Sequence, residues 1–147
     1  MKLQRRRIAA AWLPALLWMA FIFYLSSQSN PLAKTPPSDF NFVAHFGEYA
    51  ILAFLLFWAQ LATGGWKGNI RVALAASFLL ASLYGASDEY HQSFVEGRIP
   101  SWVDWGMDLL GAAFAVAVIA RWWRLLLWRQ SRYRRTVLPA DPRRGRS

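Results

Sequence analysis

The chain has 147 residues, of which 56% are hydrophobic and 16% are aromatic, and its formal net charge is +9. This length is typical of one domain, and the large apolar share, gathered into long runs, excludes a disordered chain. The same runs argue against a soluble basic protein that binds nucleic acid. Cysteine is absent, which excludes disulfides, thiolate metal sites and a cysteine nucleophile.

Four apolar runs follow one another, and each is close to the roughly 20 residues that a membrane-spanning helix requires. They predict transmembrane helices at about 8–25, 42–62, 70–92 and 102–120, the last with an interfacial extension to 128. The first run is longer than the apolar part of a signal peptide, and no Ala-x-Ala cleavage site follows it, so we expect it to be retained. The predicted fold is an all-α integral membrane bundle in one domain, 1–128, followed by a disordered basic tail over 129–147.

The distribution of positive charge predicts how the bundle sits in the membrane. If both termini are cytoplasmic, 15 of the 17 Lys and Arg residues lie on the cytoplasmic side, and only Lys34 and Arg98 lie in the two outer loops. The positive-inside rule therefore predicts an N-in/C-in topology in the lipid bilayer. The Arg- and Trp-rich stretch 121–129 then lies at the inner interface, where we expect anionic lipid headgroups, and no nucleic acid, as its partners.

Most of the ionisable side chains fall at the outward ends of the predicted helices. Seven of the eight acidic residues lie between Asp39 and Asp108, and neighbouring members three or four positions apart share a helix face. The grouped side chains are His45 and Glu48 in the second run, Asp88, His91 and Gln92 in the third, and Asp104 and Asp108 in the fourth. Three helices are therefore expected to bring polar groups to one side of the membrane.

Carboxylates beside an imidazole offer general acid–base chemistry, because His titrates near neutral pH. We take as candidate catalytic residues Asp88, His91, Asp104 and His45. The same kinds of side chain bind divalent cations, and the candidate ligands are His45, Glu48, Asp88, His91 and Asp104. The sequence leaves open whether a metal cofactor is bound.

Asp108 is expected to face the interior of the bundle. It lies about 6 Å deeper along its helix than Asp104, where an unpaired carboxylate costs about 2.5–3.5 kcal/mol on insertion scales. Arg98, in the preceding turn, is the expected partner cation. Close helix packing is predicted where small residues recur every four positions, at Ser77, Ala81 and Gly85 and at Gly111 and Ala115.

Two other interpretations of the polar groups stay open. They can form a structural network that only locks the helix ends, as in a membrane scaffold or accessory subunit. They can also belong to a small transport or proton-relay protein, which predicts polar groups continuing through the bilayer. The inner halves of the four runs hold almost none.

The segment 87–98, Ser-Asp-Glu-Tyr-His-Gln-Ser-Phe-Val-Glu-Gly-Arg, resembles the signature of the VanZ-like membrane protein family. Members share an Asp-Glu-x-x-Gln-x-Phe-x-x-Gly-Arg segment, then Asp and Gly in the next helix, and an earlier His followed by Tyr. The resemblance covers roughly residues 13–119 and marks His45, Tyr49, Asp88, Glu89, Gln92, Phe94, Gly97, Arg98, Asp104 and Gly111. Asp108 departs from the pattern, because many members have Asn there.

The family is named for a protein associated with low-level teicoplanin resistance. The resemblance implies a multi-pass protein of the prokaryotic plasma membrane that acts on or binds a cell-envelope component, a lipid-linked or headgroup substrate, with a link to glycopeptide resistance. The candidate binding residues are Glu48, Tyr49, Glu89, Gln92, Arg98 and Asp108. Whether the protein is an enzyme stays open, because no nucleophile is evident.

Overall fold

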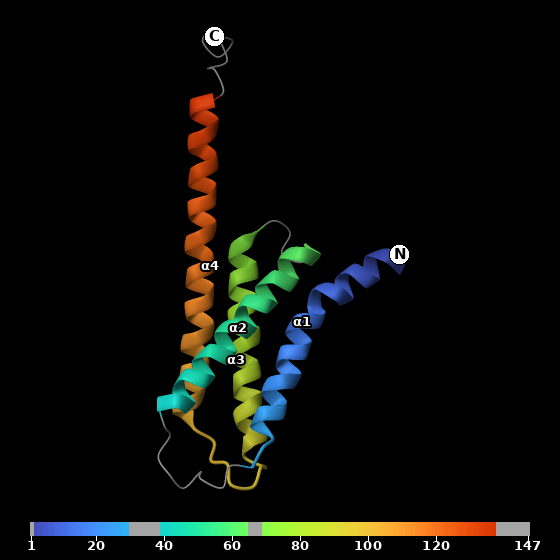
Figure 1. The fold of residues 1–147 in the computed structure, drawn as a ribbon, viewed down its shortest axis with the longest axis vertical. Helices are drawn as coiled ribbons and strands as arrows, with labels where there is room; N and C mark the ends of the chain where they lie inside the picture. Colours follow the sequence, from blue (N-terminus) through green and yellow to red (C-terminus); the bar gives the residue numbers. More distant parts are fainter. Residues whose placement is uncertain (1, 30–38, 65–68, 138–147) are drawn as a thin grey trace.

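The computed structural model describes residues 2–29, 39–64 and 69–137, and Figure 1 shows that these residues form four helices with no strand among them. The helices are α1 (Lys2–Ser26), α2 (Asp39–Thr63), α3 (Ile70–Gln92) and α4 (Trp102–Val137). All four are long and apolar enough to cross a membrane. The predicted all-α membrane bundle is therefore confirmed.

Helix α2 crosses the middle of the bundle and packs against each of the other three helices. The core between them is built from Ile22, Leu52, Ala53, Ala81 and Ala112. Large apolar side chains such as Leu17 and Leu83 point outward and are exposed. In a bilayer such side chains face lipid, so the outside of this bundle is as apolar as its core.

Small residues let the helices approach closely. Ser77, Ala81 and Gly85 are all buried on one face of α3, and Gly111 and Ala115 are buried on α4. At Gly111 an added Cβ would lie 2.1 Å from the carbonyl oxygen of Phe46. Glycine is therefore required where α4 crosses α2, in agreement with the packing predicted from the spacing of these residues.

Polar side chains also tie the helices together inside the apolar bundle. The Trp18 indole donates to the carbonyl of Glu48 at 2.9 Å, and the Tyr84 hydroxyl donates to the carbonyl of Met19 at 2.6 Å. Gln60 Nε2 donates to Ser77 Oγ at 2.8 Å. These bonds join α1 to α2, α3 to α1, and α2 to α3, which fixes how the helices are rotated against one another.

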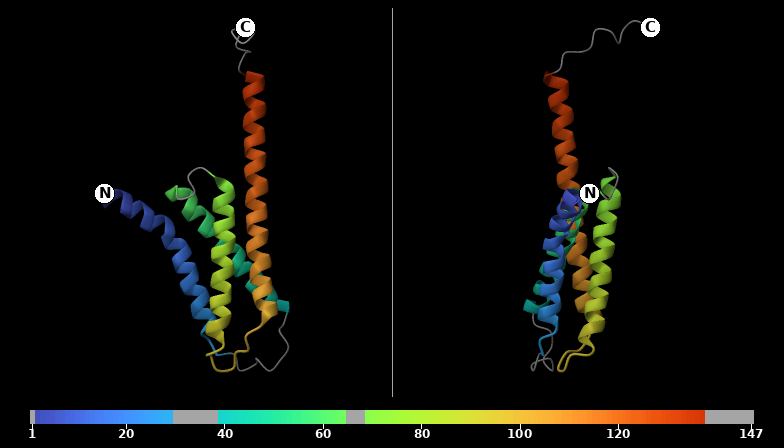
Figure 2. Two further views of the ribbon diagram at one scale, coloured as in Figure 1. Left: turned by 180° about the vertical axis from the view of Figure 1, so that it is seen from behind. Right: turned by 90° about the vertical axis from the view of Figure 1, so that its right-hand side faces the viewer.

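Helix α4 is longer than predicted. The sequence predicts disorder from residue 129, but the helix continues to Val137, as Figure 2 shows. Residues 121–137 contain neither Gly nor Pro, and their Arg and Leu residues are strong helix formers. With 36 residues, α4 is about 54 Å long, well beyond the roughly 30 Å hydrocarbon core. The rest of the predicted tail, 138–147, lies outside the described residues.

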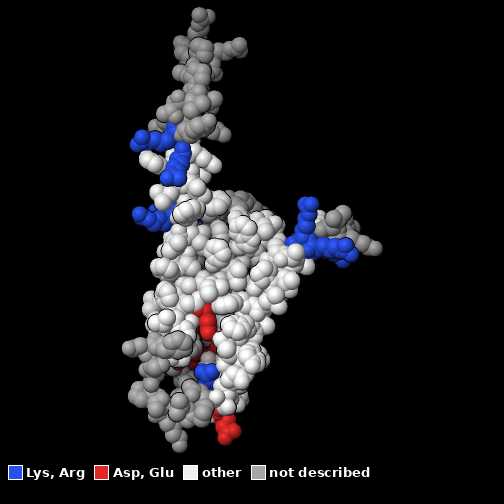
Figure 3. Space-filling view, viewed as in Figure 1, with Lys and Arg blue, Asp and Glu red and all other residues white. Residues whose placement is uncertain are grey.

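Among the described residues, most positively charged side chains lie at one end of the bundle and the acidic side chains lie at the other. Figure 3 shows Lys and Arg over the N-terminal end of α1 and the extension of α4, and Asp and Glu at the opposite end, around a single patch of positive charge. Lys34 and Lys67, which also entered the orientation argument, lie outside the described residues. This separation is what the positive-inside rule uses, and the N-in/C-in orientation stays a prediction.

Candidate functional site

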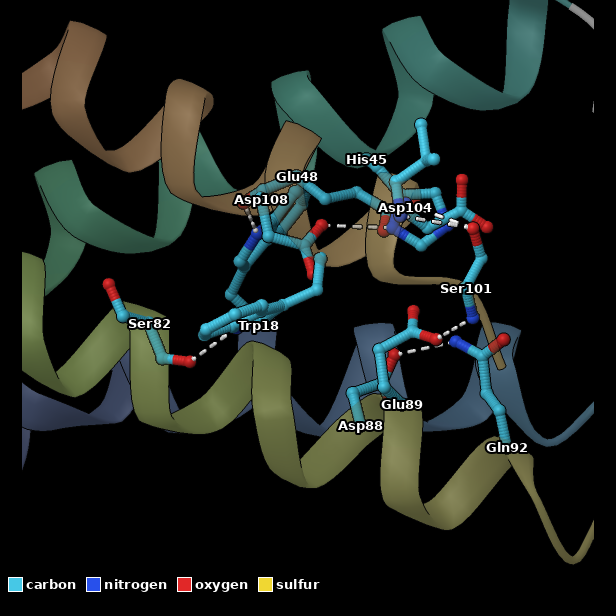
Figure 4. A network of polar contacts seen from close by, with 12 residues as sticks. Trp18, His45, Glu48, Ser82, Asp88, Glu89, Gln92, Ser101, Asp104 and Asp108 are labelled. Atoms are coloured by element: carbon cyan, nitrogen blue, oxygen red, sulfur yellow. Dashed lines mark hydrogen bonds and ion pairs between the residues drawn. The ribbon is translucent and has the colours of Figure 1, made fainter.

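Three helix ends meet at the acidic end of the bundle. The first three turns of α2 carry His45 and Glu48, the last two turns of α3 carry Asp88 and Glu89, and α4 begins just before Asp104. Figure 4 shows side chains from these three helices directed toward one another. We call His45, Asp88, Glu89, Asp104 and Asp108 the acidic cluster.

The closest contact in the acidic cluster joins α2 to α4. His45 Nδ1 lies 2.9 Å from Asp108 Oδ1, and the two residues are only 7% and 1% exposed. Asp108 therefore faces the interior, as its depth predicts. The expected partner was wrong, because His45 and not Arg98 pairs with it: His45 lies on the facing helix at the same depth, whereas Arg98 lies in the loop before α4.

Arg98 instead binds the end of α1. Its Nε donates to the carbonyl of Gln28 at 3.1 Å, and its Nη2 donates to the carbonyl of Leu25 at 3.0 Å. The last carbonyls of a helix have no partner within the helix. Leu25 is in the last turn of α1 and Gln28 follows just after it, so Arg98 ties the loop before α4 to the end of α1. Gly97 precedes it with a φ of 76°, a conformation that favours glycine, which accounts for the glycine at this position.

Glu89 joins the His45–Asp108 pair from α3. One ligand-type atom from each of the three residues lies within 4.8 Å of the others. Glu89 Oε2 accepts a hydrogen bond from the backbone N–H of Ser101 at 2.8 Å, which fixes the carboxylate. The sequence predicts Glu89 as a binding residue but not as a metal ligand. The sequence does contain a pattern that indicates its position. Ser77, Ala81 and Gly85 recur every four residues on the face of α3 that packs against other helices, and the next residue in this series is Glu89.

Several buried polar atoms of this region have no hydrogen-bond partner among the described residues. They are Tyr49 Oη, Asp88 Oδ1, Glu89 Oε1, Asp104 Oδ1 and Asp108 Oδ2. Asp88 satisfies its other oxygen with Gln92 Nε2 at 3.0 Å. Buried polar atoms are normally paired, so waters, ions or ligand groups are the expected partners of these oxygens.

His91 lies elsewhere. Its ring stacks on Phe23 with centroids 4.3 Å apart, and its Nδ1 lies 3.5 Å from Ser26 Oγ. Although His91 is only three residues after Asp88, it packs against α1. The two imidazoles that the sequence analysis grouped therefore have different surroundings, and His45 is the one paired within the acidic cluster.

Two hollows flank the acidic cluster. A groove of about 350 Å³ lies between α3 and α4 and is lined by Glu89, Tyr90, Pro100, Trp102 and Trp105, among others. A smaller cavity of about 70 Å³ lies on the other side, against α1 and α2, with His45, Glu48, Asp88, Gln92 and Arg98 in its walls. Glu89 and His45 line different hollows, so the cluster separates them.

These features define a multi-pass α-helical membrane protein with a buried acidic cluster at one end. A family model described as VanZ/LLP1 matches residues 11–127, and the chain belongs to this family. The resemblance found in the segment 87–98 is therefore confirmed. No curated protein and no solved structure matches the chain.

Proposed function

We propose that this protein binds the polar headgroup of a cell-envelope lipid between α3 and α4, at the outer face of the membrane. The observation that carries the proposal is the position of Glu89. Its carboxylate lines the groove, has an unpaired buried oxygen, and lies within 4.8 Å of ligand atoms of His45 and Asp108. An amphiphilic molecule binds where an apolar surface adjoins a polar one. Glu89 lies at this boundary, because it lines the apolar groove and also belongs to the acidic cluster.

The groove suits the apolar part of such a molecule. Trp102 and Trp105 pack edge to face with ring centroids 5.9 Å apart, and both line it. A volume of about 350 Å³ is within the range of small-molecule sites. Aromatic side chains at this depth also mark the membrane interface, so a lipid chain can enter from the outer leaflet without crossing water.

The acidic cluster suits a headgroup that donates hydrogen bonds. The unpaired atoms on Asp88, Glu89, Asp104 and Asp108 are all carboxylate oxygens, which accept hydrogen bonds when ionised. Hydroxyl and ammonium groups complement them. The cavity beside α1 and α2 is small, about 70 Å³, compared with about 350 Å³ for the groove. We therefore expect the headgroup to enter from the groove and to meet Glu89 first.

A chemical role would use the same residues. Asp88 and Asp104 form the anionic floor, and His45 is the group positioned to move a proton. Hydrolysis or group transfer on a lipid-linked substrate is the matching reaction class. The family is named for a protein associated with teicoplanin resistance, and capture of an envelope lipid at the outer face is compatible with such a role.

Photo-cross-linking tests the binding. The full chain in lipid nanodiscs is given photoactivatable phosphatidylethanolamine, whose ammonium donates hydrogen bonds, or the matched phosphatidylcholine, whose headgroup has no donor. We expect stronger cross-linking of the ethanolamine lipid to groove peptides, and a severalfold loss with Glu89→Gln. Glu96→Gln is the control, because Glu96 is an exposed residue of the loop before α4. Equal labelling by both lipids, or no effect of Glu89→Gln, would contradict the proposal and favour a scaffold.

A further inference from the structure

We infer that His45, Glu89 and Asp108 form a binding site for a divalent transition-metal cation. The inference rests on the proposed function, because it concerns the same acidic cluster and names the cation that would complete it. The three residues come from α2, α3 and α4, and one imidazole nitrogen and two carboxylate oxygens lie within 4.8 Å of one another.

The spacing of these atoms is that of a coordination sphere. Nitrogen and oxygen ligands lie about 2.0–2.6 Å from a divalent cation, so ligands on opposite sides of it are about 4–5 Å apart. Adjacent ligands at right angles are about 3 Å apart when each bond is about 2.1 Å. His45 Nδ1 and Asp108 Oδ1 are 2.9 Å apart and hydrogen-bonded to each other, so an ion that enters between them would replace this hydrogen bond. Only small side-chain movements are therefore needed to surround an ion.

The unpaired buried oxygens are a second observation that favours a bound cation. Asp108 is 1% exposed and Asp104 is 8% exposed, yet each keeps one oxygen with no partner among the described residues. Glu89 Oε1 is unpaired in the same sense, while its Oε2 is held by the N–H of Ser101. A carboxylate with one oxygen anchored and the other unpaired is oriented for coordination.

The charge of the acidic cluster also favours a cation. His45 supplies at most one positive charge for four buried or half-buried carboxylates, and Arg98 directs its Nε and Nη2 to the carbonyls that end α1. Buried carboxylates that stay ionised are normally paired or coordinate a metal. A divalent ion would neutralise Glu89 and Asp108 together and leave His45 neutral, as coordination requires.

The ligand set selects the class of ion. One imidazole with carboxylate oxygens suits Zn²⁺ or Mn²⁺, whereas Mg²⁺ and Ca²⁺ prefer oxygen ligands alone. Three protein ligands leave at least one coordination position open, as in catalytic rather than structural zinc sites. Because Glu89 also lines the groove, an open position would face the phosphate of the bound lipid. The unpaired oxygens of Asp88 and Asp104, which are not ligands, would then accept from the headgroup's hydrogen-bond donors.

Metal binding is measured on the full chain, purified in detergent, stripped with EDTA and dialysed against Zn²⁺ or Mn²⁺. We expect one ion per chain by elemental analysis, a bound Mn²⁺ signal in electron paramagnetic resonance, and a higher thermal midpoint when the ion is present. Glu89→Gln should weaken binding by at least about tenfold, because a neutral amide replaces one of three ligands. The amide oxygen of this variant can still accept from Ser101, so the fold is retained, and Glu96→Gln should bind as the unchanged chain does.

The outcomes separate this inference from the proposed function. A chain that binds neither ion, or a Glu89→Gln variant that binds with unchanged affinity, overturns the metal site. If the EDTA-treated chain still cross-links phosphatidylethanolamine while no ion binds, the proposed function survives without the metal. One ion per chain without any lipid preference leaves the metal site in place and overturns the lipid proposal.

Discussion

Gly85 of α3 lies directly against Asp108 of α4: a Cβ at Gly85 would be 2.9 Å from Asp108 Oδ2 and 3.3 Å from Asp108 Cβ. The same Cβ would be 3.2 Å from Cε1 of Tyr49, which is fully buried. The missing side chain of Gly85 therefore provides the space in which α2, α3 and α4 bring together a phenol and a carboxylate.

Gly85→Ala is expected to displace Asp108 and to destabilise the protein by about 1–3 kcal/mol, the usual cost of overpacking. The measurement is the free energy of unfolding in detergent. Gly47→Ala is the matched control, because a Cβ at Gly47 meets nothing within 4 Å and alanine favours helix by up to about 1 kcal/mol. Equal stability of the two variants would show that α3 and α4 are not packed so closely.

The His45–Asp108 pair is expected to behave as a coupled unit. His45→Ala or Asp108→Ala should each cost about 3–5 kcal/mol, because the remaining partner is left buried without its counterpart. The double variant should cost less than the sum of the two single variants, and this double-mutant cycle gives the coupling energy. Additive losses would mean that the two side chains do not interact in the membrane.

Arg98→Ala is expected to loosen the end of α1, at a cost of about 1–2 kcal/mol, because the carbonyls of Leu25 and Gln28 lose a charged donor. Hydrogen exchange of the backbone amides of residues 23–28 should accelerate. Arg124→Ala is the control, because Arg124 is exposed and donates only a 3.4 Å bond to Ala120 within its own helix. If lipid cross-linking falls while exchange in α1 stays unchanged, Arg98 acts as an anion clamp for the headgroup and not as a cap.

The N-in/C-in orientation can be tested with single cysteines, because the chain has none of its own. A membrane-impermeant maleimide added to intact cells should label Glu96→Cys, in the loop before α4. It should label Arg129→Cys, on the extension of α4, only after lysis. Reversed labelling would place the acidic cluster on the cytoplasmic side and exclude a lipid of the outer leaflet as its ligand.

The helices were predictable because membrane-spanning segments must be long, apolar and continuous. The predicted range 70–92 coincides with α3, and the first two ranges lie within α1 and α2. The end of α4 was missed because polarity was interpreted as disorder. A helix that leaves the bilayer no longer needs apolar residues, and only the absence of Gly and Pro before Pro139 indicated that it continues.

Sequence spacing indicates which residues belong to the acidic cluster, but it does not indicate which of these residues contact one another. Residues on one helix face can be found from three- and four-residue steps, so His45, Asp104 and Asp108 were recognised. Which of them meet depends on how the helices are rotated and how close they come. That rotation places His91 against Phe23 and directs Glu89 toward His45, and no pattern within a single helix contains this information.

The continuous course of α4 has a mechanical consequence. Gly111 is the one Gly or Pro between Asp108 and the basic segment 121–129, and it is packed directly against the backbone of Phe46 in α2. No free hinge therefore separates Asp108 from that segment, which lies about 20–30 Å away along the same axis. A push or twist applied at the Arg-rich end would be transmitted along the rod to the carboxylate facing His45, and the two sides of the membrane would be mechanically connected through one helix.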